Sequence, residues 1–154
     1  MYLNMTTDQL LKSLLDKIPL VHHMGVGVTA CSLEKVSITA ELEKNRNHRH
    51  TAFGGSLNTI LTLAAWSWLT NFLAEKDLET QTEVVIQDCH SRYLKPVVKD
   101  FCATGWSPLK AEQDRFLEAL ARKGVARIAI KSEVLDKDIL MADFVGQFVV
   151  VIKK

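Results

Sequence analysis

The chain has 154 residues, of which 47% are hydrophobic, and its formal net charge is +1. This length and apolar content suit one domain with a sizeable core, so residues 1–154 are expected to form a single domain. The near-neutral charge, without a Lys/Arg patch interleaved with aromatic residues, excludes nucleic-acid binding as the leading function.

The N-terminal part predicts a short helix followed by two strands. Thr6 and Gln9 have the spacing of a capping box, and an apolar stripe then runs to Pro19, which ends the helix. Apolar and polar residues alternate over residues 26–30 and 36–43. Period two with polar outer positions predicts two half-buried strands.

A long uncharged segment follows, from Thr51 to Ala74. It opens on the pair Gly54-Gly55 and predicts a helix over about residues 54–75. Polar residues such as Asn58 are scattered through it, so burial within the protein is favoured over a membrane span. Apolar side chains surround this helix and are expected to leave no face for water.

The remainder predicts four strands, at residues 83–94, 101–106, 125–135 and 139–151, with an extra helix at about 108–123. Ser107 is the expected N-cap of that helix, Pro108 its first residue, and Gly124 its end. Clustered strands imply a largely antiparallel sheet, hence an α+β fold in which a curled sheet wraps round the long helix.

Two motifs resemble the hotdog-fold acyl thioesterases. Residues 47–55 read NHRHTAFGG, and residues 92–97 read RYLKPV. Residues 88–96, DCHSRYLKP, make the chain similar to a thioesterase domain that occurs alone or behind a GNAT-type acetyltransferase domain. The resemblance implies a hotdog fold, an acyl-CoA or acyl-carrier-protein substrate, no cofactor or metal, and a homodimer or dimer of dimers with sites between protomers.

The sequence departs from the relatives at their catalytic acid. In the branch with a known mechanism this acid lies on the central helix, seven residues after the second glycine, where the present chain has Thr62. The helper serine of those relatives corresponds to Ile86. Residues 54–74 contain no acid, so the base for hydrolysis must come from elsewhere.

The candidate catalytic residues are Asn47, Gly54, Asp88 and His90. Asp88 and His90 are two apart on a strand, so they should share a face with each other and with Ile86, and could activate water. The alternative is a surface ion pair with Arg92. Asn47 could position water or substrate, or simply bond its own loop.

The candidate substrate-binding residues surround the helix start. The resemblance favours the Gly54 N–H as the donor to the thioester oxygen, with Phe53, Gly55 and Ser56 beside it. The alternative is that the glycines serve packing alone. Arg49 and Lys95 could contact the phosphates of coenzyme A, or be ordinary surface charges.

Several other functions remain open from the sequence. The helix without an acid motivates a non-catalytic acyl-CoA binder or regulator, whereas a hydratase would need that acid. A faint glycine-rich segment at residues 22–27 suggests an acetyltransferase, but the order of elements is wrong. His48 and His50 lack further ligands at metal-site spacing.

The sequence also predicts where the protein is found. It has three cysteines without a CxxC motif, and it carries charges near the N-terminus, where a signal peptide is apolar. These features predict a cytoplasmic protein that does not bind membranes.

Overall fold

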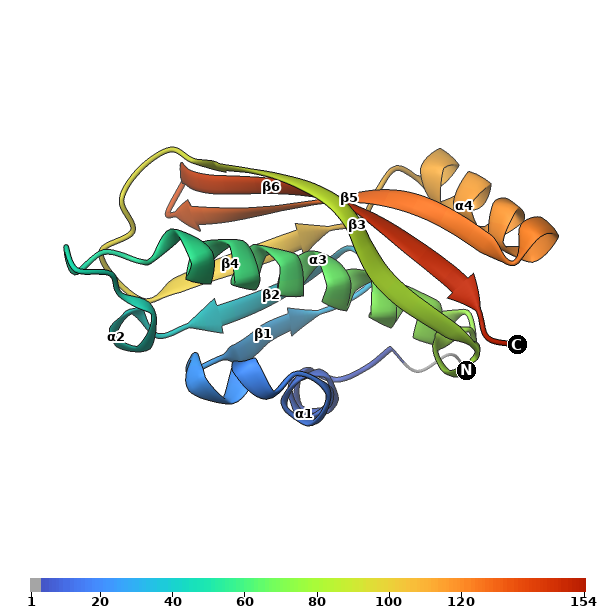
Figure 1. Ribbon diagram of the computed structural model, residues 1–154, viewed down its shortest axis with the longest axis horizontal. Helices are drawn as coiled ribbons and strands as arrows, with labels where there is room; N and C mark the ends of the chain where they lie inside the picture. Colours follow the sequence, from blue (N-terminus) through green and yellow to red (C-terminus); the bar gives the residue numbers. More distant parts are fainter. Residues whose placement is uncertain (1–3) are drawn as a thin grey trace.

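The structure is a computed structural model that describes residues 4–154 (Figure 1). It is an α+β fold in which a six-stranded sheet of order β1-β2-β4-β5-β6-β3 curls round the long helix α3 (Gly54–Glu75). Every neighbouring pair of strands is antiparallel. The predicted hotdog architecture is confirmed.

The strands are β1 (Gly27–Cys31), β2 (Lys35–Ala40), β3 (Thr82–Tyr93), β4 (Phe101–Trp106), β5 (Val125–Asp136) and β6 (Ile139–Ile152). The other helices are α1 (Thr7–Lys17), the one-turn α2 (Leu42–Asn45) and α4 (Lys110–Lys123), with 3-10 turns η1 (Pro19–His23) and η2 (Glu79–Gln81). In the sheet order, β1 and β3 are the two edges.

Helix α3 forms the centre of the core because its apolar residues face the sheet. Ile60, Leu61 and Leu69 are fully buried there. At Gly105 in β4 the sheet and helix backbones almost touch, since a Cβ there would lie 2.4 Å from the Ala64 carbonyl oxygen. Only glycine fits at that position, so Gly105 sets how closely the sheet wraps round the helix.

The expectation that α3 leaves no face for water is wrong. Asn58, Thr59, Thr62 and Trp66 are half-buried, and their spacing puts them along one side of the helix. The two threonine hydroxyls donate to the carbonyl oxygens four residues earlier, at 2.9 and 2.7 Å. A polar stripe therefore runs along α3, where helix backbone groups satisfy its hydroxyls.

The N-terminal helix forms as predicted. The Thr6 hydroxyl accepts from the Gln9 N–H at 3.2 Å, and the Gln9 side chain accepts from the Thr6 N–H at 2.9 Å. Leu10 and Leu14 are fully buried on its inner side. The capping box thus fixes the start of an amphipathic helix that packs against β1.

Two predicted boundaries are wrong because tertiary contacts decide them. The second strand ends at Ala40, and the chain turns into α2, whose Leu42 N–H donates to the Asp100 carboxylate at 2.8 Å. Ser107 is not the helix cap: Leu109 occupies that position, and the Ser107 N–H donates to the Glu34 carbonyl at 3.0 Å. The helix begins two residues later than expected, at Lys110.

Helix α4 packs where β5 has no partner in β4. β4 pairs with β5 only through residues 131–134 of β5, and α4 packs beside the rest of that strand (Figure 1). The Phe116 ring lies 6.5 Å from the ring of Phe72 on α3. Gly124 ends α4 at φ +71°, as its glycine predicted. No helix within residues 4–154 is long and apolar enough to span a bilayer.

Candidate active site

The first turn of α3 presents uncapped amides. Phe53 is the N-cap and its side chain makes no capping hydrogen bond. The first intrahelical bond of the helix runs from the Leu57 N–H to the Phe53 carbonyl, at 3.0 Å. The N–H groups of Gly54, Gly55 and Ser56 precede it, and within residues 4–154 no acceptor is recorded for them. Three donors and the positive end of the helix dipole thus point out of this turn.

A cavity of about 340 Å³ opens beside this turn. Its walls are Thr51, Ala52, Gly54, Leu57, Tyr93, Leu94, Lys95, Pro96 and Val97. The segment after β3 is held there because the Leu94 and Lys95 N–H groups both donate to the Met141 carbonyl, at 2.8 and 3.1 Å. The structure therefore brings the predicted residues Gly54 and Lys95 into one cavity.

The two glycines have different surroundings. A Cβ at Gly54 would lie 3.8 Å from the Tyr93 ring, an ordinary van der Waals contact. A Cβ at Gly55 would lie 2.5 Å from the ring of Phe53, whose side chain is 55% exposed and folds back over the glycine. Gly55 is thus needed for the position of the Phe53 ring, whereas nothing in the packing requires glycine at residue 54.

Asn45 fixes the entry to the helix, a role that the sequence did not reveal. Its side chain is buried and donates to the carbonyl oxygens of Met24, at 2.8 Å, and Glu41, at 2.7 Å. Its own carbonyl accepts from the Phe53 N–H at 2.7 Å. Asn45 therefore holds the N-cap of α3 against two other segments. No sequence pattern separates it from Asn47.

Asn47 makes its hydrogen bonds within its own loop. Its side-chain oxygen accepts from the N–H groups of Arg49, at 2.8 Å, and Thr51, at 3.2 Å, and its NH₂ group donates to the Thr51 hydroxyl at 2.9 Å. Asn47 thus bonds its own loop, which was the alternative to positioning water or substrate. Arg49 is exposed on the same loop, which leads directly to the start of α3.

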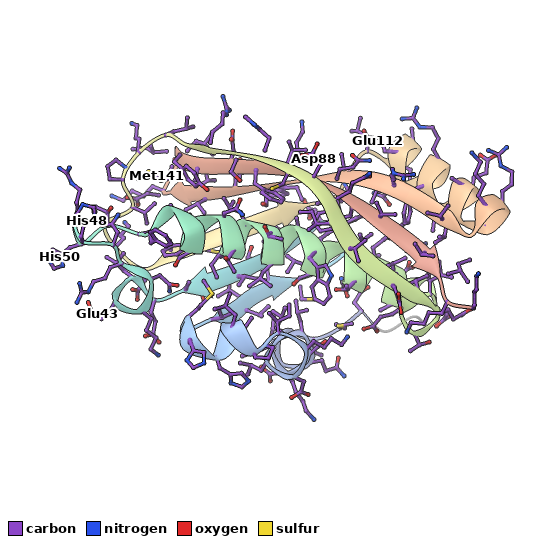
Figure 2. All side chains as sticks on the ribbon, viewed as in Figure 1. Glu43, His48, His50, Asp88, Glu112 and Met141 are labelled. Carbon is purple, nitrogen blue, oxygen red and sulfur yellow. The ribbon has the colours of Figure 1, made fainter. Side chains whose placement is uncertain are left out.

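A β-bulge overturns the prediction that Asp88 and His90 share a face with Ile86. Ile86 is paired with Phe148, but Asp88 is paired with Gln147, so Gln87 is an extra residue on β3. Phe148 is buried against α3, which places Ile86 on the inner face. Asp88 and His90 lie together on the outer face, and Figure 2 shows Asp88 on the side of β3 away from α3.

The inner face of β3 beyond the bulge carries other residues. The Ser91 hydroxyl donates to the Asn58 side-chain oxygen at 2.5 Å, which ties β3 to α3 one turn after the glycine pair. Tyr93 follows on the same face and its ring lies against Gly54. Cys89 precedes them and is exposed. None of these inner residues is an acid or a histidine.

Arg92 shares the outer face with Asp88 but pairs with a different acid. Its guanidinium donates to the two carboxylate oxygens of Asp143, at 3.0 and 2.5 Å. These hydrogen bonds and the positive charge lower the pKa of Asp143, with a smaller contribution from His90. The ion pair with Arg92 that was the alternative to a catalytic role for Asp88 and His90 thus forms with Asp143 instead.

The two histidines of the loop before α3 lie apart from Asp88 (Figure 2). His48 and His50 are at the end of the molecule beyond the start of α3, well away from Asp88 (Figure 2). Both are exposed, and His50 has a φ of +60°. Within residues 4–154 no group of three or more His, Cys, Asp or Glu side chains is placed to hold a metal ion.

Comparison with known proteins identifies one family. The sequence model described as "putative thioesterase (yiiD_Cterm)" matches residues 7–152, nearly the whole chain.

Solved structures agree in fold over the full length. A protein of unknown function from Chlorobaculum tepidum is 25% identical, with a TM-score of 0.88 over 97% of this chain and 99% of its own. A putative thioesterase from Shewanella oneidensis is 28% identical, with a TM-score of 0.80 over 94% and 96%. A probable thioesterase from Pseudomonas aeruginosa is 15% identical, with a TM-score of 0.80 over 99% and 100%, and shows the fold alone.

Proposed function

The chain belongs to the putative thioesterase family, and on that premise we propose that it hydrolyses an acyl thioester at the N-terminus of α3. The observation that carries the proposal is the set of three amides, on Gly54, Gly55 and Ser56, that have no recorded acceptor within residues 4–154. The first of them, Gly54, lines a cavity. Thioester hydrolysis passes through a tetrahedral intermediate whose oxygen becomes negative. Amides already pointing at that oxygen lower the barrier because they need no rearrangement during the reaction.

The substrate we propose is an acyl group carried by coenzyme A or an acyl carrier protein. The carbonyl oxygen accepts from the Gly54 N–H, with Phe53, Gly55 and Ser56 beside it. Both carriers have phosphate groups, for which Lys95 in the cavity wall and Arg49, exposed on the loop before α3, provide charged donors. Asn47 is proposed to orient the loop that closes this rim, through its bonds to Arg49 and Thr51.

The attacking water also needs a base, and the cavity walls include no acid or histidine. Asp88 and His90 remain our proposed base, but within one chain they lie on the opposite face of β3. They could act only across the edge of that strand. Normal turnover in both an Asp88→Asn and a His90→Ala protein would remove them from the mechanism.

A homodimer is part of the proposal because β3 is a long free edge. Its twelve residues pair with β6 on one side only, and Val85 and Ile86 are 57% and 41% exposed on it. An exposed edge of this length is a template for pairing with another strand. Light scattering during size-exclusion chromatography measures the mass, and a purely monomeric protein contradicts this part of the proposal.

A non-catalytic acyl-thioester binder is the second candidate, favoured by the absence of an acid or histidine from the cavity walls. One experiment separates the two functions. Purified protein is given a panel of acyl-CoAs, from short to long chain and aromatic, and also acyl carrier protein thioesters. Thiol release above the spontaneous rate supports hydrolysis. A raised melting temperature without thiol release supports binding alone, and the absence of both contradicts both functions.

A further inference from the structure

The outer face of the sheet carries a second cavity, which shares only His90, one of the two residues of the proposed base, with the thioesterase proposal. It has a volume of about 450 Å³, within the range of small-molecule sites. Its walls include one tryptophan and five side chains that can carry a charge: Trp106, His90, Arg92, Lys131, Glu133 and Asp143. A second hollow of about 330 Å³ shares Trp106 and Lys131 with it and reaches the start of α4. The two hollows together form a groove with Trp106 at its centre.

The strand register aligns these residues across the sheet. Trp106 is paired with Lys131, Lys131 with Val145, and Val145 with His90. Directly paired residues have side chains on the same face. With roughly 4.8 Å between strands, this row spans about 14 Å from Trp106 to His90. A row of this length can contact both ends of a small ligand.

The Trp106 ring is held in one orientation. Its indole N–H donates to a Glu133 carboxylate oxygen at 3.1 Å, and the Lys35 ammonium lies 5.5 Å from the ring centroid. A ring fixed from two sides loses little entropy when a second planar group stacks on it. Trp106 therefore provides a platform for a flat ring.

Two side chains of the cavity, Lys131 and His90, are available to bind an anion. Asp143 is occupied by the bidentate pair with Arg92. Within residues 4–154, the recorded side-chain bonds of the two acids of this cavity go to Arg92 and Trp106, and none goes to Lys131 or His90. Lys131 thus offers a free charged donor, and His90 offers a ring nitrogen. Only one oxygen of Glu133 is used by the indole, which leaves the other to accept from a hydroxyl.

We propose that this groove binds a nucleoside phosphate with a purine base. The base stacks on Trp106, the sugar hydroxyls donate to Glu133, and the phosphate accepts hydrogen bonds from Lys131 and His90. Stacking on tryptophan suits a purine because of its large planar surface. The site lies on the outer face of the sheet, whereas the amides of α3 open on the inner side, so the groove is separate from the thioester cavity.

The test uses adenosine monophosphate as the probe, with adenosine and ribose 5-phosphate for comparison. Titration calorimetry should show the nucleotide binding at least tenfold more tightly than either fragment. Its binding should also change the intrinsic fluorescence, and a Trp106→Phe protein should lose this change although Trp66 and Trp68 remain. No binding of the nucleotide, equal binding of ribose 5-phosphate, or an unaltered signal in the Phe variant would each overturn the proposal.

A matched pair of lysine variants tests the phosphate end. Lys131→Ala should weaken nucleotide binding about 10- to 100-fold, the effect of losing one charged hydrogen bond, and should leave adenosine binding unchanged. Lys12→Ala, on the exposed side of α1, should change neither. Equal nucleotide affinity in the two variants would refute the assignment. Thiol release is measured separately, so failure of the thioesterase proposal leaves this result interpretable.

Discussion

A proline at residue 54 tests the proposed oxyanion donor directly, because it removes one N–H and keeps the helix start. Gly54 is the first residue of α3, the position that proline tolerates best. The preceding Phe53 has φ −64° and ψ +134°, within the region that a residue before proline adopts. The Cβ meets only the Tyr93 ring, at 3.8 Å. Gly54→Pro should therefore fold with nearly unchanged stability.

The expected kinetic effect is large. Removing one donor to an oxyanion lowers kcat by about 10²–10³-fold, or roughly 2.7–4 kcal/mol. KM should change little, since the N–H acts on charge that develops in the transition state. Gly54→Ala is the matched control, because it adds the same Cβ and keeps the N–H, and its kcat should stay within about threefold of the original.

The assay is thiol release with the acyl-CoA that gives the fastest turnover, after melting curves have shown that both variants fold. A kcat for Gly54→Pro equal to that of Gly54→Ala would refute the assignment of this amide. An equal fall in both variants would show that the space beside Tyr93, and not the N–H, limits the reaction.

Three further predictions concern stability. Gly105→Ala should lower the free energy of unfolding by about 1–3 kcal/mol, because its Cβ collides with the α3 backbone; unchanged urea unfolding contradicts this. Asn45→Ala should cost roughly 1–3 kcal/mol per carbonyl left without a donor, and a melting temperature like that of Asn47→Ala would argue against its anchoring role. Asp143→Asn removes a carboxyl with a lowered pKa, so the stability that it contributes is present above its unfolded pKa of about 3.9 and is lost as pH falls through the lower folded value. The difference in stability between Asp143→Asn and the original protein should shrink below about pH 4, and a pH-independent difference contradicts the reasoning.

The long helix could be predicted almost to the residue because its signals are local. An uncharged run of two dozen residues opens on a glycine pair, and the structure places α3 at Gly54–Glu75. α1 and the end of α4 follow equally local signals, a capping box and a C-terminal glycine. By contrast, the predicted start of α4 was wrong. The Ser107 N–H bonds to the Glu34 carbonyl, a contact that local sequence does not specify, and the helix begins only at Lys110.

The exposed stripe of α3 could not be predicted from composition. Trp66 and Thr62 read as members of an apolar, all-round buried helix, and each is half-buried. Which side of a helix stays open depends on how far the sheet closes round it. Here β3 is an edge strand, so the side of α3 next to it receives less cover than the side under the central strands. Sequence periodicity indicates that a helix is apolar, but it does not indicate which side of the helix the sheet leaves exposed.

Only some residues of the candidate site could be predicted from the sequence, for a related reason. Gly54 and Lys95 meet in one cavity because each lies at the end of an element whose position the fold determines. Asn45 and Ser91 were missed because their partners, Met24 and Asn58, are distant in the sequence. A buried amide that bonds remote backbone has no local pattern to distinguish it from a loop residue.

Gln87 decides which side chains of β3 can meet a substrate at α3. Alternation counted from Ile86 puts Asp88 and His90 on the inner face, but the extra residue reverses the count and turns Ser91 and Tyr93 inward instead. The bulge carries no glycine, so the sequence gives no sign of it. The consequence is chemical: the inner face receives hydroxyl groups and loses its acid and histidine. In the proposed hydrolysis, the thioester oxygen would meet the amides of α3, whereas proton transfer would require a group brought across the β3 edge. The contrast between the Gly54 variants and the Asp88 and His90 variants separates these two requirements.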